Sequence, residues 1–105
     1  MNEKQKALLK TINEFKVDLW GNPKRPDDVQ ENCCEHCGKP LGKNPLYVHV
    51  NTNGTILPNG VQEEDLPGIG MQSQGCFPIG INCAKKLLGK KLPLYTFTYE
   101  NKTGI

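Results

Sequence analysis

The cysteines Cys34 and Cys37, separated by two residues and followed by Gly38, constrain the fold of this chain more than any other feature. This spacing is typical of a zinc knuckle, a tight turn that lets both sulfurs reach one metal ion at about 2.3 Å. Backbone N–H groups of such a turn can point at the thiolates and offset their charge. Glycine suits the position after the second cysteine if the turn requires a positive φ there. A thioredoxin-type redox pair would need a βαβ unit, which the sequence does not indicate.

A structural zinc site needs four protein ligands. Three candidates lie downstream of the knuckle, namely His49, Cys76 and Cys83. Cys83 falls in the first turn of a predicted helix, where unpaired N–H groups and the helix dipole favour a thiolate. For the fourth place we prefer His49, because imidazole suits zinc as well as thiolate does. The predicted ligands are therefore Cys34, Cys37, His49 and Cys83, with Cys76 as the alternative to His49.

Two further candidates adjoin the knuckle. Cys33 would form a pair with Cys37 across three residues, which fits a knuckle poorly, and His36 lies inside the turn itself. We interpret both as non-ligands.

The composition agrees with a domain that needs a metal. Hydrophobic residues make up 36% of the 105 residues and aromatic residues only 7%, so the core of one small domain is thin and a metal can supply the missing stability. The five cysteines are an odd number, and the first thirty residues lack the apolar core of a secretion signal. We therefore expect a reducing, cytoplasmic environment. No apolar run approaches the roughly 18–20 residues of a membrane-spanning helix, so we expect no membrane association.

The N-terminal residues from Glu3 to Trp20 are predicted to form an amphipathic helix that ends before Gly21. Four apolar side chains share one helical stripe there: Leu8, Ile12, Phe15 and Leu19. The polar residues 22–32 contain two prolines and show no period, which is typical of a linker. The predicted organisation is a helix at 1–21, a linker at 22–32 and a zinc-binding domain at 33–105.

The central residues predict a β-hairpin. The stretch 46–50 is β-branched and aromatic, the turn dipeptide Asn53-Gly54 follows, and residues 55–57 can return as the partner strand. Residues 58–74 are predicted to form a long loop. A short strand at 76–79 would lie at a sheet edge, because Pro78 cannot donate to a ladder.

The C-terminal residues predict a helix and then a strand. Asn82 is a good N-cap for a helix that Gly89 ends. From Leu94 to Tyr99 aromatic residues alternate with threonine, which indicates a strand. The predicted fold is therefore a small α+β domain.

The order of knuckle, hairpin and ligand at a helix start resembles the treble-clef class of zinc domains. The motifs that carry the resemblance are CEHCGKPLG at 34–42, YVHV at 47–50 and GCFPIGINCAKKL at 75–87. The same stretch also resembles uncharacterised small zinc-binding proteins of bacterial and phage type. Many treble clefs place a second cysteine in the helix turn, where this chain has Lys86, so the fourth ligand must come from elsewhere. The resemblance implies a small zinc module of a phage or mobile element.

An enzyme is disfavoured by the sequence. A zinc deaminase requires His-x-Glu, whereas His49 is followed by Val50 and Asn51, and the chain has only two histidines. We therefore expect a binding module, with a host protein as the partner.

Nucleic acid is the alternative partner. The net charge is only +2, but four lysines gather in a stretch that has no acidic residue: Lys85, Lys86, Lys90 and Lys91. They could contact phosphates, with three aromatic residues as stacking platforms: Tyr95, Phe97 and Tyr99.

Overall fold

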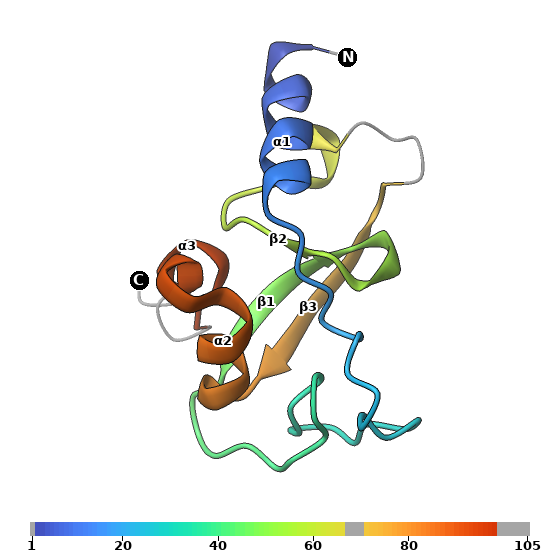
Figure 1. Cartoon of the computed structure of the whole chain (residues 1–105), viewed down its shortest axis with the longest axis vertical. Coiled ribbons are helices and arrows are strands. Elements are labelled where there is room, and N and C mark those ends of the chain that lie inside the picture. Colours follow the sequence, from blue (N-terminus) through green and yellow to red (C-terminus); the bar gives the residue numbers. More distant parts are fainter. Residues whose placement is uncertain (1, 67–70, 99–105) are drawn as a thin grey trace.

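The computed structural model describes residues 2–66 and 71–98 of the chain. It shows a small α+β fold, as predicted, with helices and a three-stranded antiparallel sheet (Figure 1). The strand order in the sheet is β2-β1-β3. In chain order the elements are α1 (Glu3–Glu14), β1 (Leu46–Asn51), β2 (Ile56–Leu57), β3 (Ser73–Ile79), α2 (Ile81–Leu88) and α3 (Leu92–Tyr95). Single 3₁₀ turns span Thr52–Gly54, Glu63–Asp65 and Gly89–Lys91. In the described part of the chain, no helix has the length and apolar character needed to cross a membrane.

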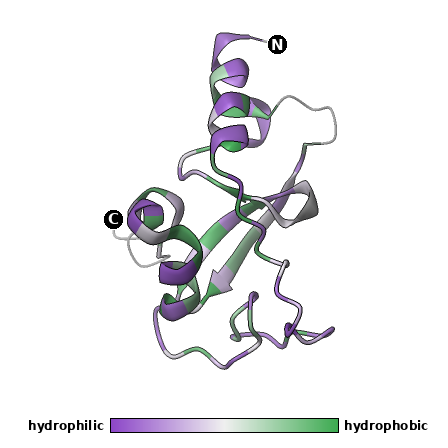
Figure 2. Cartoon of the chain, in the orientation of Figure 1, coloured by the Kyte–Doolittle hydropathy of each residue, from purple (hydrophilic) through white to green (hydrophobic). Residues whose placement is uncertain are grey.

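The N-terminal helix is shorter than the sequence predicted. Its start is well capped, because Asn2 Oδ1 accepts the Gln5 N–H at 2.8 Å while Gln5 Oε1 accepts the Asn2 N–H at 3.0 Å. The helix ends at Glu14, where Phe15 adopts an extended conformation with φ −143° and ψ 95°. The predicted end at Trp20 is therefore wrong. In Figure 2 the ribbon of α1 is largely hydrophilic.

The residues after α1 leave the helix because the sheet offers them other backbone partners. The Leu19 N–H donates to Gly54 O at 2.8 Å, and the Ile56 N–H donates to Val17 O at 2.9 Å. Leu19 is completely buried. The apolar stripe is thus divided, since Ile12 packs in a small cluster with Leu57 whereas Leu19 joins the main core.

The predicted hairpin is confirmed. β1 pairs antiparallel with β2 through His49–Leu57 and Val50–Ile56. β3 pairs along the other side of β1 and so lies at a sheet edge, as predicted from Pro78. It begins at Ser73, inside the predicted loop and before the predicted strand start at Cys76. Because successive side chains of a strand point to opposite faces of the sheet, Val48 and Val50 lie in the main core and His49 lies on the opposite face.

The C-terminal segment differs from its prediction in two respects. The helix α2 begins at Ile81 with Gly80 as its N-cap, without a side-chain cap from Asn82. The predicted strand from Leu94 is instead the short helix α3 followed by one β-bridge, in which Phe97 exchanges both backbone hydrogen bonds with Tyr47. The chain turns here because Gly89 ends α2 with φ 54° and Pro93 favours a new helical turn. Tyr99 lies outside the described residues.

The main core lies between the sheet and the C-terminal helices. Its buried members come from β1, β2, β3, α2, α3 and two irregular segments: Leu19, Cys34, Val48, Val50, Ile56, Ile79, Ala84, Leu88 and Tyr95. Tyr95 packs edge-on against Phe15 with ring centroids 5.3 Å apart. Tyr95 is therefore a core residue and offers no stacking platform.

Candidate metal centre

The segment that begins at Cys34 forms a tight turn held by its own backbone. The Gly38 N–H donates to Cys34 O at 2.7 Å, and the Cys34 N–H donates to Lys39 O at 2.7 Å. Gly38 has φ +82°, which confirms the predicted need for glycine. A Cβ at this position would also lie 2.6 Å from Cγ of Pro26. A residue with a Cβ would therefore be strained at this position and would approach Pro26 too closely.

The structure brings Cys34, Cys37 and Cys83 together. Their Sγ atoms all lie within 4.8 Å of one another. Thiolates bound at about 2.3 Å to a tetrahedral ion are about 3.8 Å apart, so small adjustments would allow all three to share one metal. Three of the four predicted ligands therefore form a group that could hold a metal ion.

Hydrogen bonds connect the knuckle to the corner between β3 and α2. The Glu35 N–H donates to Pro78 O at 2.9 Å, and the Gly80 N–H donates to Cys34 Sγ at 3.2 Å. Cys83 lies in the first turn of α2, so the corner between β3 and α2 brings its sulfur close to the knuckle. The sequence analysis missed Gly80 as a donor, because nothing local connects it with a cysteine 46 residues earlier.

The electrostatics of the group favour a bound cation. Burial by itself would raise the pKa of the Cys34 thiol, but N–H groups of Gly80, Cys37 and His36 lower that pKa overall. Burial, reinforced by hydrogen bonds and charge from Cys37 and Cys34, raises the pKa of Cys83 to about 12. The pKa of one thiol is thus lowered while the pKa of its neighbour is raised. A metal cation would remove this conflict, because it stabilises every thiolate that it binds.

The structure does not bring His49 or Cys76 into this group. Both side chains lie on the sheet face opposite Val48, where His49 and Cys76 are register partners. His49 Nε2 lies 2.6 Å from Ser73 Oγ. The three grouped cysteines belong to the core on the Val48 face. Among residues 2–66 and 71–98, no fourth His, Cys, Asp or Glu joins the three sulfurs.

Cys33 and His36 do not belong to the group of three sulfurs, and their interpretation as non-ligands stays a prediction. His36 is only 8% exposed. Its Nδ1 atom lies 2.7 Å from Leu19 O. The middle of the knuckle is therefore anchored to the segment that follows α1.

The predicted linker contacts the knuckle closely. Arg25 donates from Nε to Glu35 O at 2.6 Å and from a terminal nitrogen to Glu35 Oε1 at 2.7 Å. Asn22 Nδ2 donates to His36 O at 3.0 Å. The division into helix, linker and zinc domain stays a prediction, but residues 22–26 support the fold of the knuckle directly.

The lysines of the alternative nucleic-acid site are all exposed: Lys85, Lys86, Lys90 and Lys91. Lys91 Nζ lies 5.1 Å from the centroid of the Phe15 ring. Phe97 stacks on Tyr47 with ring centroids 6.1 Å apart. Since Tyr95 is buried, the predicted row of aromatic platforms beside these lysines does not form within the described residues.

Comparison with protein-family models, with curated proteins and with solved structures finds no match to this chain. The resemblance to treble-clef domains therefore stays a prediction that rests on the motifs.

Proposed function

We propose that this chain is a small zinc-binding module in which Cys34, Cys37 and Cys83 hold the ion. The single observation that carries the proposal is the approach of their three Sγ atoms to within 4.8 Å of one another. Soft thiolates select zinc, copper(I) or iron–sulfur clusters. We propose zinc because two cysteines separated by two residues and followed by glycine form its usual binding turn. The fourth coordination position is then left to a donor other than the His, Cys, Asp and Glu side chains of the described residues.

The proposed role of the ion is structural. The ion would join the knuckle to the first turn of α2. Because only 36% of the residues are hydrophobic, the core is small, and the ion would add stability that the core does not supply. The module would then act by binding, as the sequence predicted, and not by catalysis. A protein partner is preferred over nucleic acid because the net charge is only +2 and acidic residues are scattered along the chain.

The proposed partner is a host protein, and the module is proposed to come from a phage or mobile element and to act in the cytoplasm. This part rests on the motif resemblance at residues 34–87 and on the odd number of cysteines. The test begins with elemental analysis of protein prepared without chelator, where we expect about one zinc per chain. Capture from a bacterial lysate, with and without nuclease, then separates a protein partner from nucleic acid. Absence of metal, or captured material that nuclease removes, would contradict the proposal.

Nucleic acid is the second candidate, favoured by the exposure of the four lysines Lys85, Lys86, Lys90 and Lys91. Each lysine that contacts a phosphate should add nearly one unit to the slope of log affinity against log salt. Fluorescence anisotropy with a labelled single strand and a duplex, at two salt concentrations, measures this slope. Sub-micromolar binding that disappears when all four lysines become glutamine would favour nucleic acid over protein.

A further inference from the structure

The three grouped sulfurs lie at the boundary between the main core and the surface. Cys34 is only 1% exposed, and its Sγ atom accepts the Gly80 N–H at 3.2 Å. Cys37 and Cys83 are both partly exposed. An ion held by all three would therefore have the buried Cys34 on its inner side and the two partly exposed cysteines toward the surface. The outer side of the group decides what else such an ion can bind.

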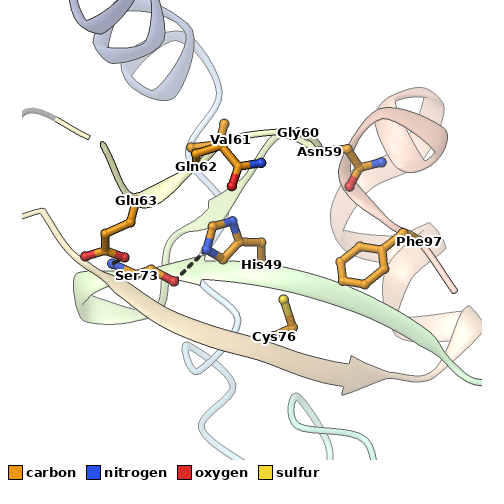
Figure 3. A pocket seen from close by; sticks show the side chains of 9 residues that line it. All are labelled: His49, Asn59, Gly60, Val61, Gln62, Glu63, Ser73, Cys76 and Phe97. Atoms are coloured by element: carbon orange, nitrogen blue, oxygen red, sulfur yellow. Dashed lines mark hydrogen bonds between the residues drawn. The ribbon is translucent and has the colours of Figure 1, made fainter. Parts of the chain in front are cut away.

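Three thiolates do not complete the coordination of zinc, which takes four ligands in a tetrahedral arrangement. In the part of the chain that the structure describes, no further His, Cys, Asp or Glu side chain belongs to the group. The two candidates from the sequence, His49 and Cys76, line a hollow on the other face of the sheet (Figure 3). His49 Nε2 lies 2.6 Å from Ser73 Oγ there. These two side chains therefore lie on the side of the sheet away from the three sulfurs.

The helix α2 places a lysine beside the group. Residues three apart on a helix are neighbours on its surface, so Lys86 is next to Cys83. Lys86 is exposed, and a charged ammonium group has no lone pair to offer a metal. The surface beside Cys83 is thus occupied by a side chain that does not bind zinc while it is charged. The same helix geometry makes residue 86 a suitable place to introduce a donor.

The charge of the site selects the kind of donor. Zinc bound to three thiolates carries one net negative charge. A fourth anionic donor would add another negative charge next to the buried Cys34, where charge is costly. The exposed Lys86 offsets little of this charge, because solvent screens it. A neutral imidazole nitrogen would leave the net charge unchanged, and imidazole suits zinc as a ligand. A neutral nitrogen donor is therefore favoured over a carboxylate or a further thiolate.

We infer that the ion keeps an exchangeable fourth position, and that this position takes the imidazole of a histidine from a partner protein. The inference rests on the proposed function, because it requires a zinc ion on Cys34, Cys37 and Cys83. Zinc sites with three protein ligands keep their remaining position for an exchangeable ligand. The metal would then contribute to recognition of the partner as well as to stability.

The test uses the full chain loaded with Co²⁺, whose visible absorption depends on its ligands. Near-ultraviolet absorption of cobalt–thiolate bonds reports whether the three cysteines bind the ion. Imidazole should shift the visible bands with a Kd on the order of 1 mM, and the cobalt–thiolate absorption should persist. N-acetylhistidine methylamide should bind with similar affinity, whereas N-acetylglutamine methylamide should not bind. Acetate and 2-mercaptoethanol should bind at least about tenfold more weakly, because each would add negative charge.

Two variants of α2 test the position directly. Lys86→His places an imidazole one helical turn after Cys83 and should fill the fourth position from within the chain. Its cobalt spectrum should resemble that of the parent with imidazole, and added imidazole should bind at least about tenfold more weakly. Lys85→His is the matched control and should behave like the parent, since residues two apart on a helix do not face each other. Full cobalt content and a melting temperature no lower than that of the parent show that both variants are folded.

The outcomes separate this inference from the metal proposal. If cobalt binds through three thiolates but imidazole leaves the spectrum unchanged, the chain itself fills the fourth position and only this inference fails. Equal affinity for imidazole and acetate, or equal behaviour of Lys86→His and Lys85→His, would also overturn it. Absence of cobalt–thiolate absorption would overturn the metal proposal and this inference with it.

Discussion

The Nδ1 atom of His36 lies 2.7 Å from the carbonyl oxygen of Leu19. His36 is in the middle of the knuckle, and Leu19 is completely buried in the main core. This contact links the cysteine turn to the segment that follows α1, across 17 residues of sequence. The polar connection at residues 22–26 then packs around the same turn through Arg25 and Asn22. Metal binding and packing of the N-terminal segment are therefore expected to depend on each other.

Replacing a grouped cysteine should remove the metal. For Cys34→Ser or Cys83→Ser we expect zinc to fall from about one per chain to almost none, together with most of the soluble folded protein. Elemental analysis of purified protein and the soluble yield measure both effects. Cys33→Ser is the control and should resemble the parent, since Cys33 lies outside the group. Full zinc in Cys83→Ser would refute this ligand set.

Replacing His49 or Cys76 should leave the metal in place. Both residues lie on the sheet face opposite the grouped sulfurs, and neither joins them. We expect His49→Ala and Cys76→Ser to retain at least most of the zinc of the parent in elemental analysis. Loss of zinc from folded His49→Ala protein would restore His49 as the fourth ligand, as the sequence analysis predicted. Loss only from Cys76→Ser would assign that place to Cys76.

Removing the metal should unfold the sheet and the C-terminal helices. Structural zinc supplies on the order of 10 kcal/mol of apparent binding energy, comparable to the whole stability of a small domain. The sole tryptophan, Trp20, packs edge-on against Phe77 of β3 with ring centroids 5.8 Å apart. Its fluorescence and the near-UV circular dichroism should therefore change on chelation and recover when zinc is added. A cooperative melt that persists in chelator would show that the core is sufficient by itself.

Two glycines of the knuckle region form a matched pair. Gly38→Ala should destabilise the protein by about 2 kcal/mol or more, because alanine disfavours a positive φ and its Cβ would meet Pro26. Gly42→Ala should change the free energy of unfolding by less than about 0.5 kcal/mol, since no atom lies within 4 Å of a Cβ there. Urea unfolding of the zinc-loaded proteins measures both values. Equal effects at the two positions would contradict the role given to Gly38.

The ion pair of Arg25 and Glu35 should stabilise the knuckle. The two side chains are only 21% and 16% exposed, and Arg25→Ala would leave the Glu35 carboxylate without this cation. We expect a loss of about 1–3 kcal/mol in the free energy of unfolding. Arg25→Lys should recover little of this stability. A lysine has a single terminal nitrogen and cannot reproduce the two contacts of arginine, to the carbonyl oxygen and to Oε1 of Glu35.

Lys24→Ala is the matched control, since Lys24 is exposed and next in sequence. Its free energy of unfolding should stay within about 0.5 kcal/mol of the parent. If Lys24→Ala and Arg25→Ala were equally destabilised, the effect would come from general charge and not from the contact with Glu35.

Features set by neighbouring residues could be predicted from the sequence. The turn at Gly38, the hairpin around Gly54, the edge position of Pro78 and the stop at Gly89 all follow from the conformations that glycine and proline allow. The three grouped cysteines were also predictable, because a knuckle and a helix start are both local geometries that favour thiolates.

Only the tertiary structure decided what depends on residues far apart in sequence. The end of α1 at Glu14 follows from hydrogen bonds between residues 17–19 and residues 54–56, which propensity along the chain does not reveal. The predicted C-terminal strand was wrong for a related reason. Residues 92–95 form α3, and Phe97 makes one β-bridge with Tyr47, a residue far away in the sequence.

The position of His49 is the clearest case. Its residue type and its place after the knuckle made it a reasonable zinc ligand, but alternation along β1 decides the face on which its side chain lies. Val48 and Val50 occupy the face that packs with the cysteine group, so His49 is directed to the other side and pairs with Cys76. The sequence alone determined which residues can bind a metal. The pairing and packing of the sheet decided which of them meet, because one residue along a strand reverses the direction of a side chain.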